Sequence, residues 1–108
     1  MRILKKEDFL HQQLQSKSTN EQYSLCYVIS EALKSKQLFF HHDIIAPSKR
    51  SSAPHRHTHI EEVLYIIKEN VTIIYNDQKQ IVEKGSFILF DPIETNFHYL
   101  FKLELSPN

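Results

Sequence analysis

The sequence predicts a small all-β domain, and three observations support this fold class. From Tyr23 onward, short runs rich in β-branched and aromatic residues alternate with turn-forming residues. Runs this short and this closely spaced are typical of a β-sandwich or β-barrel. The 108 residues suffice for one domain with one modest core, and no repeat divides them. The runs expected to form strands are 23–29, 37–46, 62–67, 71–75, 79–83, 86–90 and 97–105.

The chain before these runs has a different texture. We expect residues 1–22 to be an N-terminal extension and residues 23–108 to be the β domain. Within the extension, Leu10 and Leu14 stand four positions apart, which is the spacing of one helix face. The extension is therefore expected to be a short helical or irregular segment, with any helix lying within 5–15.

Turns in this fold have to be made almost without glycine, because Gly85 is the only glycine in the chain. Asn76 and Asp77 separate two β-rich runs, and both residue types tolerate a positive φ better than most. This pair therefore predicts a β-hairpin turn.

Composition excludes several classes of protein. The 13 basic and 13 acidic residues leave no net formal charge, so nucleic acid and anionic membranes are poor partner candidates. No apolar run approaches the length of a transmembrane helix, and the N-terminus lacks the apolar core of a signal peptide. Cys26 is the only cysteine, which rules out an internal disulfide and fits a reducing compartment. We expect a cytoplasmic protein.

A cluster of histidines is the strongest chemical signal in the sequence. His55, His57 and His59 alternate, so in an extended segment all three point to one face. Glu61 and Glu62 follow and offer carboxylate oxygens. Two imidazoles with a carboxylate suit iron, manganese, nickel or zinc and can leave coordination positions open. The alternative is a solvated, histidine-rich loop that binds nothing.

Two stretches of the chain together resemble the cupin superfamily, in particular its small single-domain members. Residues 54–67 read PHRHTHIEEVLYII, which is similar to the first cupin motif: His-x-His, three or four residues, then Glu leading into a strand. Residues 85–98 read GSFILFDPIETNFH, which is similar to the second motif: a glycine-led strand, a proline-containing turn and a last histidine. The stretch between them matches the usual intermotif hairpin.

The motif spacing chooses among the clustered residues. Counting from the pair His55 and His57, four residues precede Glu62, which fits the family pattern. Counting from the pair of His57 and His59 leaves only two, so the resemblance demotes His59 and Glu61.

The resemblance implies a jelly-roll, or double-stranded β-helix, barrel that holds one divalent transition metal (Fe, Mn, Ni or Zn). By position, its ligands would be His55, His57, Glu62 and His98. The function it implies is that of a metal-dependent enzyme, of the oxygenase or isomerase type, acting on a small organic metabolite. The alternative is a non-catalytic module that binds or senses a small ligand.

The chain also departs from the family pattern. Several turn glycines are missing: Glu69 and Asn70 stand at one such turn, and Asn76 and Asp77 at another. The sequence after His98 is shorter than cupins commonly have, which would leave a sheet edge in need of cover. The N-terminal segment, about residues 1–35, or a second subunit could cover it. We expect a homodimer, with strand 23–29 or 37–46 helping to complete the partner's sheet.

Other notable side chains are expected to be structural. His41 and His42 are adjacent on a predicted strand, so at most one of them faces inward, and we expect one buried and one exposed packing histidine. His11 is expected to be solvated, and Cys26 to be a small buried hydrophobe rather than a reactive thiol. Period two places Glu62, Leu64 and Ile66 on one face, and Val63, Tyr65 and Ile67 on the other. The aromatic residues expected mostly in the core are Phe39, Tyr65, Phe87, Phe90, Phe97, Tyr99 and Phe101.

Overall fold

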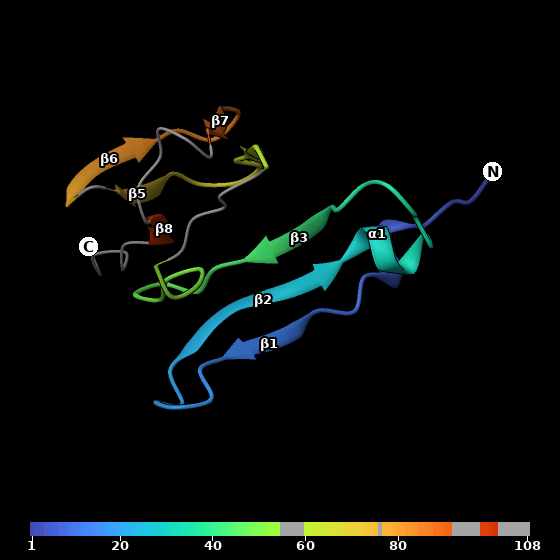
Figure 1. Ribbon diagram of the computed structural model, residues 1–108, viewed down its shortest axis with the longest axis horizontal. Coiled ribbons are helices and arrows are strands. Elements are labelled where there is room, and N and C mark those ends of the chain that lie inside the picture. Colours follow the sequence, from blue (N-terminus) through green and yellow to red (C-terminus); the bar gives the residue numbers. More distant parts are fainter. Residues whose placement is uncertain (55–59, 76, 92–97, 102–108) are drawn as a thin grey trace.

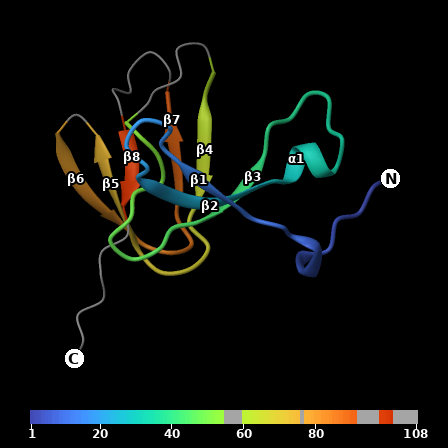
Figure 2. The same cartoon turned by 90° about the horizontal axis from the view of Figure 1, so that it is seen from below.

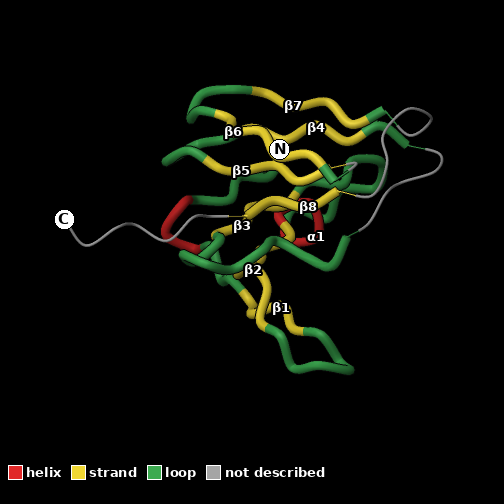
Figure 3. Tube along the Cα trace, turned by 90° about the vertical axis from the view of Figure 1, so that its left-hand side faces the viewer, coloured by secondary structure: helices red, strands yellow, loops and turns green. Residues whose placement is uncertain are grey.

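A computed structural model describes residues 1–54, 60–75 and 77–91 and the backbone of residues 98–101. The all-β fold is confirmed, since strands make up most of the regular structure and helix is confined to short segments (Figure 3). In the described residues the strands form three hydrogen-bonded sheets, which are not closed into one barrel. In these residues no helix is long and apolar enough to cross a membrane. The elements in chain order are η1 (Lys6–Asp8), β1 (Gln12–Gln15), β2 (Gln22–Val28), α1 (Ile29–Ala32), β3 (His41–Ile44), β4 (Glu62–Tyr65), β5 (Val71–Tyr75), β6 (Gln78–Val82), β7 (Phe87–Phe90) and β8 (His98–Phe101).

The N-terminal sheet has the strand order β1-β2-β3, and all its pairings are antiparallel (Figure 1). A helix over 5–15 was wrong beyond its first turn, because only Lys6–Asp8 is helical and β1 follows it. The physical reason is pairing: Gln12 lies opposite Cys26 and Gln13 opposite Leu25, so β2 fixes this segment as an edge strand. Tertiary hydrogen bonding here outweighs a weak local helix preference.

The hairpin turn predicted at residues 76–77 joins β5 and β6. In the antiparallel pair of β5 and β6, Tyr75 lies opposite Gln78, which brackets a two-residue hairpin turn. Asp77 takes the expected positive φ of 58°, and Asn76 lies outside the described residues. Gly85 turns between β6 and β7 at φ 86°, where its N–H donates to the carbonyl of Ile66 over 2.6 Å.

The core is small and lies on the inner faces of β5 and β7 and just after the end of β4. Its buried apolar side chains among the described residues are Ile66, Ile73 and Phe90. The expectation that the aromatic residues named above lie mostly in the core was wrong for three of the four whose side chains are described. Phe39, Tyr65 and Phe87 are exposed, while Phe90 is 7% exposed. The number of aromatic residues does not tell which face of a strand each ring lies on. Tyr65 and Phe87 lie on the outer faces of their strands, and Phe39 precedes β3.

Helix α1 was missed by the sequence analysis and shortens both neighbouring strands. The hydroxyl of the buried Ser30 accepts the N–H of Phe40 over 3.0 Å, and the Phe40 carbonyl accepts the Ser30 N–H over 2.9 Å. This exchange attaches the residues before β3 to α1, so β3 begins only at His41. Nothing in the local residue pattern of 29–32 distinguishes a helical turn from the end of a strand.

Replacing Lys34 by glycine is expected to stabilise the fold by about 1 kcal/mol, because a side chain in the left-handed region costs about that much. Lys34 lies just after α1 at φ 57°, and the Ser35 N–H closes the helix end by donating to the Ser30 carbonyl over 2.9 Å. Urea unfolding would measure the gain. Lys36→Gly is the matched control, since Lys36 is not among the residues with positive φ; an equal gain there would contradict this explanation.

Candidate metal-binding sites

The four ligands predicted from the motifs are only partly within the described structure. His55 and His57 lie outside the described residues. Glu62 is the first residue of β4, and His98 is the first residue of β8, where the backbone alone is described. The metal site remains a prediction, and Glu62 is the ligand whose side chain can be assessed.

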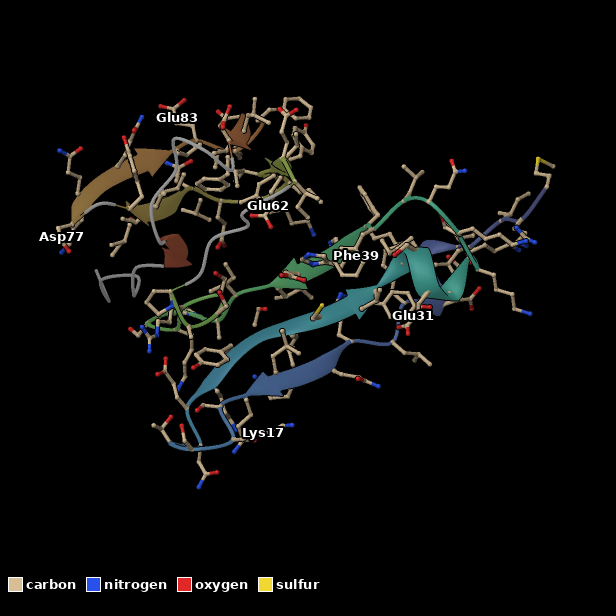
Figure 4. The ribbon with its side chains drawn as sticks, viewed as in Figure 1. Lys17, Glu31, Phe39, Glu62, Asp77 and Glu83 are labelled. Atoms are coloured by element: carbon tan, nitrogen blue, oxygen red, sulfur yellow. The ribbon has the colours of Figure 1, made fainter. Side chains whose placement is uncertain are left out.

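Glu62 lies on the inner face of β4, as the alternation predicts. Along this strand Glu62 and Leu64 are half-buried, and Ile66, just after the end of β4, is buried. The alternate residues Val63 and Tyr65 are exposed, so the two faces are clearly distinguished. From this face Glu62 reaches from β4 toward β3 (Figure 4).

The backbone brings the relevant segments to one end of the molecule. Glu62 pairs with Phe90, so the start of β4 lies beside the end of β7. His98 pairs with Tyr75, which places the start of β8 beside the end of β5. Figure 2 shows the start of β4, the end of β7 and the start of β8 at the same end of the molecule.

The loop that leads into the histidine cluster is attached to the N-terminal sheet. Arg50 forms a two-point ion pair with Glu21, with its Nε and one terminal nitrogen donating over 2.7 and 2.8 Å. The N–H of the buried Ser24 on β2 donates to the Ser51 carbonyl over 3.4 Å. These contacts fix the chain a few residues before His55.

Replacing Glu21 by glutamine is expected to lower stability at neutral pH and to matter less in acid. The hydrogen bond from Arg50 lowers the pKa of the Glu21 carboxyl below its usual 4.5. A carboxyl whose pKa is lower in the folded state stabilises the fold above its unfolded pKa, and the effect disappears as pH falls through the folded value. Urea unfolding of wild type and Glu21→Gln should therefore differ at neutral pH and converge well below pH 4.5. Glu7→Gln, at an exposed glutamate, is the control; a gap that persists unchanged in acid would refute the assignment.

A second group of potential metal ligands lies on β2 and β3, and the sequence analysis did not find it. Cys26, His41 and Asp43 each offer one ligand atom, and these atoms all lie within 4.8 Å of one another. His41 Nδ1 is 2.7 Å from a carboxylate oxygen of Asp43 and 3.8 Å from the Cys26 sulfur. This Cys/His/Asp triad could hold a metal ion.

Electrostatics in the triad favour the protonated forms of both Cys26 and His41. Burial, together with the Asp43 carboxylate, raises the pKa of the Cys26 thiol to about 12. The hydrogen bond to Asp43 raises the pKa of His41 against an opposing effect of burial, and the charge of Glu62 acts in the same direction as Asp43. The raised pKa of Cys26 agrees with an unreactive thiol. The expectation of a buried hydrophobe was wrong, because Cys26 is half-buried and lies beside the polar His41 and Asp43.

The face of β2 and β3 opposite the triad carries a pair of histidines, His11 and His42. His11 Nε2 and His42 Nδ1 are 2.8 Å apart and share a hydrogen bond, with the rings of Phe9 and Tyr27 packed beside them. His41 and His42 thus face opposite ways, as predicted. The expectation of a solvated His11 was wrong, because β1 pairs with β2 and carries His11 against His42.

Comparisons with known proteins bear on the fold. No family model matches the sequence, and no curated protein matches it significantly. Among solved structures, the chain is similar to a protein from Acidithiobacillus ferrooxidans that is described as a proposed sugar phosphate isomerase. The TM-score is 0.76 at 17% identity, and the match covers 93% of this chain and 65% of the other. At this identity the likeness shows a shared all-β fold, and the chain spans about two thirds of the length of that neighbour.

Proposed function

We propose that this protein is a cupin-type metal-binding domain whose His55, His57, Glu62 and His98 hold one divalent transition metal. The observation that carries the proposal is the position of Glu62, the one ligand whose side chain is described. It is a half-buried carboxylate on the inner face of β4. A carboxylate oxygen and imidazole nitrogens form a donor set that suits iron, manganese, nickel or zinc.

The backbone arrangement supports the remaining ligands. His98 starts β8, Glu62 starts β4, and these two strand ends lie at the same end of the molecule (Figure 2). The chain enters β4 from residue 60, only three positions after His57. The ion pair of Arg50 and Glu21 fixes the chain on the other side of the histidines. The residues just before β4 and at the start of β8 are therefore suitably placed to supply ligands to one site.

For the reaction, we propose a metal-dependent conversion of the isomerase type on a small organic metabolite, with a phosphorylated sugar as the first substrate class to test. The fold shared with the protein described as a proposed sugar phosphate isomerase motivates this choice. When bound, the metal would supply a Lewis acid that polarises a substrate carbonyl. The half-buried Glu62 provides negative charge for the cation, and the apolar Leu64 and Ile66 on the same face limit access of water.

The experiment is a screen of metal-loaded protein against phosphorylated aldoses and ketoses, with oxygen uptake measured in parallel for an oxygenase. We expect interconversion of at least one aldose–ketose pair, and we expect Glu62→Gln to abolish it. Glu61→Gln is the matched control, since Glu61 is the exposed neighbour that the motif spacing demotes. Turnover that survives Glu62→Gln, or that Glu61→Gln removes equally, would contradict the assignment.

A non-catalytic module that binds or senses a small ligand is the second candidate. The inner face of β4 favours it, because after Glu62 that face carries only apolar Leu64 and Ile66. This strand therefore offers no second acid–base group beside the proposed ligand. Saturable binding of a metabolite to the loaded protein, without turnover in the screen, would decide for this candidate.

We also propose that the protein forms a homodimer through the edge of its N-terminal sheet. Strand β2 already pairs on both sides, with β1 and β3. Of the two strands expected to complete the partner's sheet, β3 is therefore the one that lies at an edge of the described sheet. Light scattering at micromolar concentration should give twice the monomer mass of 12.8 kDa. A monomer would refute this proposal without affecting the metal site.

A further inference from the structure

The register of β2 against β3 brings Cys26, His41 and Asp43 to one face. Cys26 pairs directly with Asp43, and His41 lies two residues before Asp43 on the same strand. Side chains two apart on a strand share a face, and directly paired side chains do so as well. The intervening His42 faces the other way, toward His11. The three potential ligands are therefore held together by backbone pairing and do not depend on a flexible loop.

The distances among the three ligand atoms, all within 4.8 Å, lie on both sides of the spacing in a zinc site. Typical zinc bonds of about 2.3 Å to sulfur and 2.0–2.2 Å to nitrogen and oxygen place tetrahedral donor atoms about 3.4–3.6 Å apart. Cys26 sulfur and His41 Nδ1 are 3.8 Å apart, and His41 Nδ1 and the Asp43 oxygen are 2.7 Å apart. To reach tetrahedral spacing, His41 and Asp43 have to exchange their hydrogen bond for bonds to the cation and move apart.

A nucleophilic cysteine triad does not fit this geometry. In such a triad the two ring nitrogens of histidine serve separate partners, one the thiol and the other the carboxylate. Here the sulfur and the carboxylate both approach Nδ1 of His41. Three donor atoms that converge on one point fit a shared cation better than a proton relay. The negative charges of Asp43 and Glu62, both of which act on His41, also favour a cation there.

We propose that Cys26, His41 and Asp43 form a second metal site that binds a zinc-class divalent cation through one sulfur, one nitrogen and one oxygen. The site uses none of the four ligands of the proposed function, and it prefers a softer metal because one of its ligands is a thiolate. Three protein ligands leave a fourth position for water or another small ligand.

Cobalt(II) titration of the full chain tests this site, because cobalt bound to a thiolate gives a charge-transfer band in the near ultraviolet. Cys26 is the only cysteine, so any such band reports on this residue alone. We expect the band to saturate at about one cobalt per chain and to be displaced by zinc. It should disappear in Cys26→Ser, and Asp43→Asn should weaken cobalt binding by more than about tenfold, the smallest cost usual for losing even an outer-shell partner.

Two controls separate this site from the proposed function and from misfolding. The band should persist in a His57→Ala and His98→Ala double variant, whose loss of metal at the other site is measured separately. It should also persist in His42→Ala, the neighbour on the opposite face. Cobalt binding without a thiolate band in the wild-type protein, or a band lost in the double variant while circular dichroism shows an intact fold, would overturn the proposal.

Discussion

Replacing Ile73 by alanine is expected to lower the free energy of unfolding by about 2–5 kcal/mol, the usual cost of truncating a buried isoleucine. Ile73 is 4% exposed and lies on β5, the central strand between β6 and β8. Few apolar side chains are buried in the described residues, so no other part of this core can compensate. Since the free energy of unfolding of a small domain is about 5–15 kcal/mol in total, the variant should unfold at a much lower urea concentration.

Ile81→Ala is the matched control for this loss. Ile81 lies on the adjacent strand β6 opposite Thr72 and is 63% exposed, so its truncation should change stability by less than about 0.5 kcal/mol. Equal losses at Ile73 and Ile81 would show that the core does not lie on β5.

Removing His57 and His98 together is expected to abolish metal binding at the proposed functional site. The comparison is best made in a Cys26→Ser background, so that the triad on β2 and β3 contributes nothing. In that background the parent should carry about one transition metal per chain by elemental analysis, and the double variant should carry none. Binding should also weaken in mild acid, because histidine must be neutral to coordinate a metal.

His59→Ala is the control for the double variant, because His59 belongs to the same cluster and is demoted only by the motif spacing. It should retain the full metal content. Metal lost through His59→Ala, or retained without His57 and His98, would mean that the spacing had selected the wrong residues.

The parts of the fold that the sequence predicted are those with a strong local signal. Strict alternation from Glu62 to Ile67 predicted the two faces of β4. Turn chemistry predicted the hairpin at Asp77, where the backbone takes positive φ. The rarity of glycine also had its expected consequence, since Lys34 and Glu69 adopt positive φ without it.

The parts that were missed depend on contacts between distant residues. Strand β1 exists because β2 pairs with it, and its own residues carry little β signal. The Cys26, His41 and Asp43 triad depends on the register of β2 against β3, with a helix and a loop of chain between them. No spacing rule in the sequence specifies that register. Each of these residues, considered alone, was reasonably taken as structural.

The most direct test of the proposed functional site is an anomalous diffraction measurement at the absorption edge of the metal that the purified protein carries. The proposal predicts a peak beside Glu62, at the start of β4, with His55, His57 and His98 as its other protein ligands. A protein whose only anomalous peak lies at Cys26, or whose peak has no contact with Glu62, would contradict it.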